Sequence, residues 1–136
     1  MPSNEVAYQI IADALFAWME SNLSAYNVGF EYLPADAAGL MLQSNAEQPI
    51  AKEYKSGRKV YTYRFSLLMR ADNADTHNRV SAQESIKAAA DSICNATLTG
   101  FDVWEIKQDS TARVISTEER YDVVMLQMHI TYEVRG

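Results

Sequence analysis

Two histidines, one cysteine and one acidic pair are the side chains of this chain that could take part in chemistry. His77 and His129 are the only histidines, and no carboxylate lies beside either at the spacing of a metal-ligand pair. A metal site needs about three or more convergent donors, so we expect neither a metal nor a catalytic role for them. We expect His129 to be an ordinary surface or interface residue. The pair Glu118-Glu119 stands next to Arg120, which is typical of a solvated turn and not of an acid–base pair.

The single cysteine, Cys94, cannot form an internal disulfide. It lies in an alanine-rich helical stretch, which indicates a small buried hydrophobic residue and not a nucleophile. The sequence contains no G-x-S-x-G, glycine-rich phosphate loop, H-E-x-x-H or C-x-x-C motif. We therefore expect no enzyme and no cofactor or metal.

Length and charge limit the classes of protein further. The 136 residues fit one domain spanning 1–136, and the net charge is −6, from 12 basic and 18 acidic residues. Phosphate binding needs a basic patch, and the scattered lysines and arginines disfavour a nucleic-acid partner. We expect no signal peptide, because the first residues show neither its charged nor its apolar region, and no apolar run approaches the roughly 20 residues that span a bilayer. We expect no membrane contact, and folding in a reducing cytoplasm.

Two long alternating segments must organise the fold. From Tyr121 to Val134, apolar side chains recur at every second position from Val124 onward, which predicts a strand with one buried face. The segment Tyr61 to Arg70 repeats the alternation, with aromatic and aliphatic side chains on one face. Together they predict an antiparallel sheet that is covered on one side only.

Helical periodicity predicts one helix from about Glu5 to Leu23 and a second that ends near Asn95 to Thr99. Shorter alternating runs predict further strands at 27–33, 39–43, 50–54 and 101–107, and Gly57 suits a tight hairpin between 50–54 and the long strand. We expect residues 109–120 to form a polar connection to the last strand. The fold class is therefore α+β, with a mostly antiparallel sheet of four to six strands, two helices packed on one face, and the order α-β-β-(β)-β-α-β-β.

Most aromatic side chains are explained by core packing, because Tyr61, Tyr63, Tyr132 and Trp18 are in phase with apolar neighbours. The exceptions indicate a protein contact surface. Tyr54 precedes the polar hairpin, Trp104 interrupts an exposed register, and two apolar side chains, Val123 and Met125, fall on the otherwise polar face of the last strand.

Four segments in this order resemble a known family: Phe30-Glu-Tyr-Leu-Pro34, the hairpin Lys52 to Phe65, the helix cap Ala71-Asp-Asn-Ala-Asp75, and the terminal Met128-His-Ile-Thr-Tyr-Glu-Val134. The chain resembles, over nearly its whole length, the minor capsid proteins of tailed phages and prophages. Within this group it is similar to the tail-terminator, or tail-completion, proteins of phages with long non-contractile tails. These motifs are short, and they describe an architecture and not a chemical signature.

The resemblance implies a non-enzymatic virion protein that is assembled in the cytoplasm of the bacterial host. Its subunits would form a ring, commonly a hexamer, that caps the tail tube and meets the head–tail connector. The hairpin 50–60 and the loop 108–120 would project toward neighbouring subunits or the tube. The expected subunit or tube interface comprises Tyr54, Lys55, Arg58, Lys59, Trp104, Val123, Met125 and His129.

Two other functions stay open at this stage. One is a head-completion, or neck, protein of similar size. The other is a non-viral α+β domain that encloses a small ligand between Trp18, Phe30, Tyr63 and Met128. The second function requires a real cavity at these residues.

Overall fold

The seven strands of this chain form one sheet in which β4 and β7 are central. A computed structural model describes residues 4–24, 26–30, 38–44, 50–72, 76–98, 100–117 and 121–134. In chain order the elements are α1 (Asn4–Asn22), β1 (Val28–Phe30), β2 (Gly39–Ser44), β3 (Ile50–Glu53), β4 (Lys59–Asp72), α2 (Thr76–Ile93), β5 (Phe101–Gln108), β6 (Arg113–Thr117) and β7 (Tyr121–Val134). The α+β class is confirmed, although the sheet has seven strands where four to six were expected.

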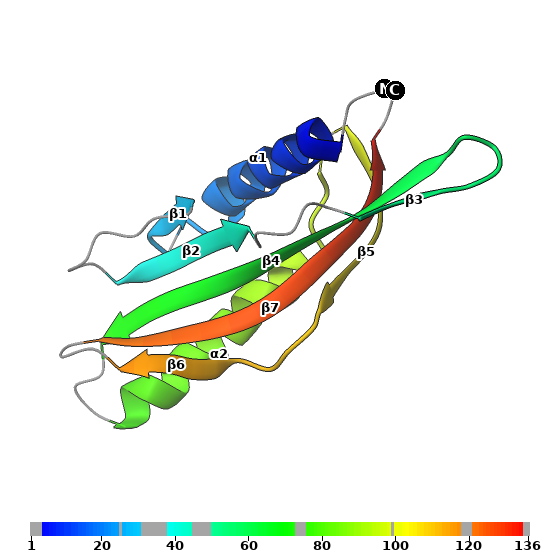
Figure 1. Cartoon of the computed structure of the whole chain (residues 1–136). Helices are drawn as coiled ribbons and strands as arrows, with labels where there is room; N and C mark the ends of the chain where they lie inside the picture. The colour runs from blue at the N-terminus through cyan, green and yellow to red at the C-terminus, as the bar shows by residue number, and fades with distance from the viewer. Residues whose placement is uncertain are drawn as a thin grey trace.

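The central pair is antiparallel, with Tyr61 opposite Tyr132 and Asp72 opposite Tyr121 (Figure 1). Strands β2 and β3 both pair with the edge of β4 that faces away from β7. Strands β5 and β6 both pair with the edge of β7 that faces away from β4. All of these pairings are antiparallel, whereas β1 pairs with β2 in parallel. The sheet is therefore mixed.

One face of this sheet, the inner face, carries the core. Along β4 and β7 the inner side chains are almost fully buried: Tyr61, Tyr63, Phe65, Leu67, Met69, Val124, Leu126, Met128, Ile130 and Tyr132. The rings of Tyr61 and Tyr132 stack across the two strands with centroids 5.6 Å apart. The predicted core positions of these tyrosines are thus confirmed, and burial raises the pKa of Tyr132. Trp18 is partly buried against the same core.

Both helices contribute an apolar stripe to this core. In α1 the stripe is Ile11, Leu15 and Met19, which recur at every fourth position and are fully buried. In α2, Ile86 and Ile93 are buried together with small alanines, which let the helix lie close to β4 and β7 (Figure 1). Burial of these stripes holds the helices in place, because most of the stability of a helix in a protein comes from the packing of its apolar face.

The β3–β4 hairpin has the tight turn that the sequence predicted. Gly57 has a φ of 86°, its amide donates to the Tyr54 carbonyl at 2.8 Å, and the Tyr54 amide donates to the Arg58 carbonyl at 2.8 Å. This is the pattern of a three-residue hairpin loop with a glycine in the left-handed region. The hairpin projects beyond the end of the sheet (Figure 1).

Two expectations are wrong in detail. The segment 108–120 is not a projecting loop, because Arg113–Thr117 pairs with the first half of β7 as β6. Residues 118–120, with the pair Glu118-Glu119, lie outside the described residues. Cys94 follows the end of α2 and is only half-buried, although it does pack against the core.

Candidate interaction surface

The outer face of the sheet, opposite the two helices, is arranged in rows by strand register. Met41 of β2 lies opposite Leu68 of β4, and Leu68 lies opposite Met125 of β7. These three side chains, here called the apolar row, are half-buried. Val123 lies one outward position further along β7, beside Arg70. The predicted placement of Val123 and Met125 on this face is confirmed, and register adds Met41 and Leu68 to them.

A charged row crosses the same face two positions beyond the polar pair Ser66 and Gln127. Arg64 of β4 lies opposite His129 of β7, which lies opposite Lys107 of β5. The His129 ring also contacts two carboxylates, with Nδ1 2.7 Å from Asp109 and Nε2 3.3 Å from Glu105.

These carboxylates correct the expectation that His129 stands apart from acidic groups. The hydrogen bond from His129 lowers the pKa of Glu105, and the charge of Lys107 acts in the same direction. The imidazole thereby joins β7 to β5 and to the turn that follows β5. No group of three His, Cys, Asp or Glu side chains suited to a metal ion occurs among the residues described. His77 falls in α2, but its side chain lies outside the described part.

A second cluster joins the hairpin to the end of the sheet. The Arg58 guanidinium donates from Nε to Glu133 Oε2 at 2.7 Å, and its Nη2 atom contacts Glu133 Oε1. The Trp104 indole N–H donates to Glu133 Oε1 at 2.9 Å, and the Arg58 guanidinium lies 5.5 Å from the centre of the Trp104 ring. A planar guanidinium suits this combination of a paired carboxylate contact and an aromatic face. We call Arg58, Trp104 and Glu133 the hairpin anchor.

A bulge in β5 places Trp104 in the anchor. Val103 pairs with Tyr132 and Glu105 pairs with Thr131, so Trp104 is the extra residue between them. Its side chain is 48% exposed. The sequence signal of an interrupted register was therefore correct, and its structural cause is this bulge.

Within the hairpin anchor, the opposite charges of Arg58 and Glu133 stabilise each other. The hydrogen bond and charge of Glu133 raise the pKa of Arg58, and the hydrogen bond from Arg58 lowers the pKa of Glu133. The Glu133 side chain is 14% exposed and the Arg58 side chain 57% exposed. The carboxylate is thus held at the sheet surface while the hairpin cation stays in contact with solvent.

The eight predicted interface residues fall into two groups. Tyr54, Lys55, Arg58 and Lys59 belong to the hairpin and its base, and Trp104 contacts Arg58 there. The other three, Val123, Met125 and His129, lie on the outer face. Sequence reasoning missed Glu133 and also Ile115, which is 45% exposed at a bulge in β6.

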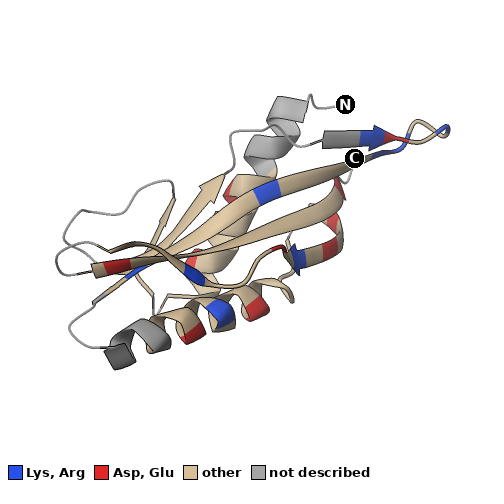
Figure 2. Ribbon diagram, turned by 60° about the horizontal axis from the view of Figure 1, so that its bottom comes forward, with Lys and Arg blue, Asp and Glu red and all other residues tan. Residues whose placement is uncertain are grey.

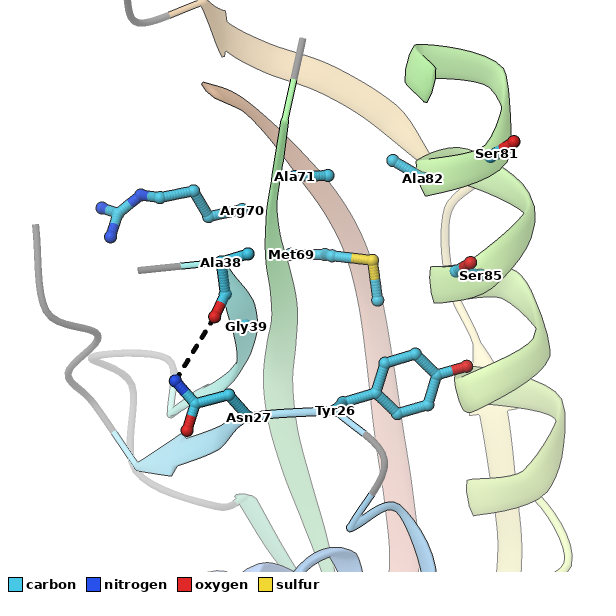
Figure 3. Close-up of a pocket in the computed structure, with 10 residues that line it drawn as sticks. All are labelled: Tyr26, Asn27, Ala38, Gly39, Met69, Arg70, Ala71, Ser81, Ala82 and Ser85. Carbon is cyan, nitrogen blue, oxygen red and sulfur yellow. Dashed lines mark hydrogen bonds between the residues drawn. The ribbon is translucent and has the colours of Figure 1, made fainter. Parts of the chain in front are cut away.

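A groove of about 550 Å³ lies between the start of β2 and α2, and is lined by Tyr26, Asn27, Ala38, Gly39, Met69, Arg70, Ala71, Ser81, Ala82 and Ser85. Figure 3 shows the Tyr26 ring and Met69 on the side of α2, and the Asn27 amide bonded to the Ala38 carbonyl. None of the four residues expected around a ligand lines it. Two of them, Tyr63 and Met128, are at most 1% exposed in the core.

Comparison with known proteins shows the fold and no more. No protein-family model and no curated protein matches the chain, while thirteen chains of solved structures are similar to it. One of these aligns over 100% of this chain and 99% of its own, with a TM-score of 0.53 and 13% sequence identity, and it carries no functional name. None of the described helices is both long and apolar enough to cross a bilayer.

Proposed function

We propose that this chain is a non-enzymatic structural subunit of a tailed phage or prophage. Its subunits assemble as a ring, by resemblance a hexamer, at the head-proximal end of the tail tube, as tail-terminator proteins do. The partners are further copies of the chain, the tail-tube protein and the head–tail connector. The protein acts in the virion after assembly in the host cytoplasm.

The observation that carries this proposal is the apolar row on the outer face. Met41, Leu68 and Met125 lie side by side there, and neither described helix covers them. Apolar side chains that adjoin one another on a sheet face that no described helix covers favour a protein contact. Such a face gives one half of an interface between subunits.

A ring needs a second, different patch, because head-to-tail interfaces join unlike surfaces. The projecting hairpin supplies it. Tyr54, which flanks its turn, is 38% exposed, and Lys52 lies 5.3 Å from the centre of the Tyr54 ring. An exposed aromatic side chain and an arginine on a projecting hairpin favour contact with another protein surface.

Light scattering and electron microscopy of the purified protein test the proposal. The expected result is a closed ring of one defined mass that binds the ends of isolated tail tubes. A protein that stays monomeric at every concentration and does not bind tube ends would contradict it.

A head-completion protein is the alternative within the phage class, and particles made without the gene distinguish the two. A tail terminator leaves unjoined tails of irregular length, whereas a head-completion protein leaves heads that leak DNA. The groove beside Tyr26 and Met69 favours a second candidate, a small-ligand-binding domain. A ligand that raises the melting temperature of wild type, but not of Met69→Trp, would support that candidate.

A further inference from the structure

Charge is distributed unevenly between the hairpin and the rest of the chain. The segment Lys52 to Lys59 contains four of the 12 basic residues and one of the 18 acidic residues. The hairpin therefore contributes +3 to a chain of net charge −6, and the remainder carries −9. Figure 2 shows mostly blue ribbon at charged positions of the projecting hairpin, whereas red and blue segments both occur along the helices and the sheet.

The hairpin presents these cations in a fixed direction. Its turn is closed by the two backbone hydrogen bonds between Tyr54 and residues 57 and 58, and Arg58, which flanks the turn, is tied to the sheet by the hairpin anchor. Arg58 already forms an ion pair with Glu133. Lys55 and Lys59 are left without an ion pair in the described part of the chain, so their charges are available to another surface.

The opposite edge of the sheet is acidic. The hairpin belongs to the β3 edge of β4, whereas β5 lies on the far side of β7. Strand β5 and the residue that follows it carry Asp102, Glu105 and Asp109 against the one cation Lys107, and all four side chains are exposed. Lys107 contacts Glu105, and His129 of β7 contacts Glu105 and Asp109, so the acidic residues outnumber the basic ones on this edge although two of them have partners within the chain. Among the strands described, β5 pairs only with β7, so its outer edge is open to another chain.

We infer that the basic hairpin of one copy docks against the acidic β5 edge of the next copy. This inference rests on the ring function proposed above and specifies which surfaces meet. Opposite charges on opposite edges of the sheet fit a head-to-tail contact, since each copy offers one surface of each kind. Trp104 on β5 is 48% exposed beside Arg58 of its own chain, and the exposed part of its ring offers an apolar centre for this contact.

A polyanion such as DNA is the other partner that a basic hairpin fits. A second copy is favoured because every copy of the chain carries this acidic edge, whose charge is opposite to that of the hairpin. A nucleic-acid contact would have to overcome repulsion from the remaining charge of −9.

Charge reversal with rescue in the full-length protein tests the inference. Lys55→Glu should weaken self-association about tenfold in sedimentation velocity, because it removes a cation and adds repulsion at the contact. Glu105→Lys alone should weaken it similarly, and the double variant should recover most of the loss. Lys87→Glu, on the exposed face of α2, changes the net charge equally and should leave association unchanged. Melting temperatures verify that each variant is folded.

The outcomes separate this inference from the proposed function. Rings that are unaffected by Lys55→Glu, or a loss that Glu105→Lys does not rescue, would overturn the docking and leave the ring itself standing. A wild-type protein that never associates would overturn both. A gel shift of duplex DNA that Lys55→Glu abolishes, with association unchanged, would assign the hairpin to a polyanion instead.

Discussion

Arg58 and Glu133 are 75 positions apart in the chain, and their ion pair ties the β3–β4 hairpin to the end of β7. Glu133 receives a second donor, the Trp104 indole, from the neighbouring strand β5. Three strands thus meet at one carboxylate. The ion pair adds a side-chain contact to the backbone pairing of β3 with β4 that directs the hairpin.

The hairpin anchor should be sensitive to acid. The Arg58 hydrogen bond holds the pKa of Glu133 below its ordinary value of 4.5. A lowered pKa means that the contribution of the pair is complete above pH 4.5 and is lost as the pH falls through the lowered value. The NMR signal of the Trp104 indole N–H should therefore stay constant from neutral pH to about pH 4.5 and shift below it.

Glu133→Gln is the matched control for this titration. The amide keeps an oxygen that can accept from Trp104, but it has no charge to lose in this range. The indole signal of the variant should not shift in acid. An equal shift in wild type and variant would show that another group is responsible.

Met125 and Leu126 separate assembly from folding. The two are neighbours on β7, but Met125 is half-buried on the outer face and Leu126 is fully buried in the core. Met125→Lys should weaken self-association and change the melting temperature little. Leu126→Lys should unfold the subunit, because an unpaired charge in the core is very costly. An equal loss of folding for both would refute the role of the apolar row.

Gly57 should be replaceable only at a cost. A Cβ at this position would meet no atom within 4 Å, so the penalty of Gly57→Ala arises only from the φ of 86°. The left-handed region costs a non-glycine residue about 1 to 2 kcal/mol. Gly57→Asn should cost less, since asparagine tolerates this region better. Amide exchange at Tyr54 should accelerate in the order wild type, Asn, Ala; the reverse order would contradict the turn geometry.

Ile86 should measure how strongly α2 is held to the sheet. Its side chain is fully buried against the core. Ile86→Ala should lower the free energy of unfolding by about 2 to 5 kcal/mol, as measured by urea denaturation. Lys87→Ala, the exposed neighbour in the same helix, should change it by no more than about 0.5 kcal/mol. Similar values for the two variants would mean that α2 contributes little to the core.

Local periodicity was enough to predict the helices and the two central strands. The alternation of Tyr61 to Arg70 and of Tyr121 to Val134 continues long enough to identify both their type and their buried face. Periodicity did not predict strand β6, for a physical reason. Its five residues are short and mostly exposed, and the bulge at Ile115 interrupts the alternation on which the prediction depends.

By itself, the sequence determined which side chains are apolar, which are charged and which segments can bury one face. It therefore placed Val123 and Met125 on the outer face and the cations on the hairpin. Only the tertiary structure decided what they meet. Register across β2, β4 and β7 joined Met41 and Leu68 to Met125, and the pairing of β7 with β5 brought Glu105 and Asp109 to His129. These contacts depend on pairing between strands that are far apart in the chain, and no local spacing encodes it.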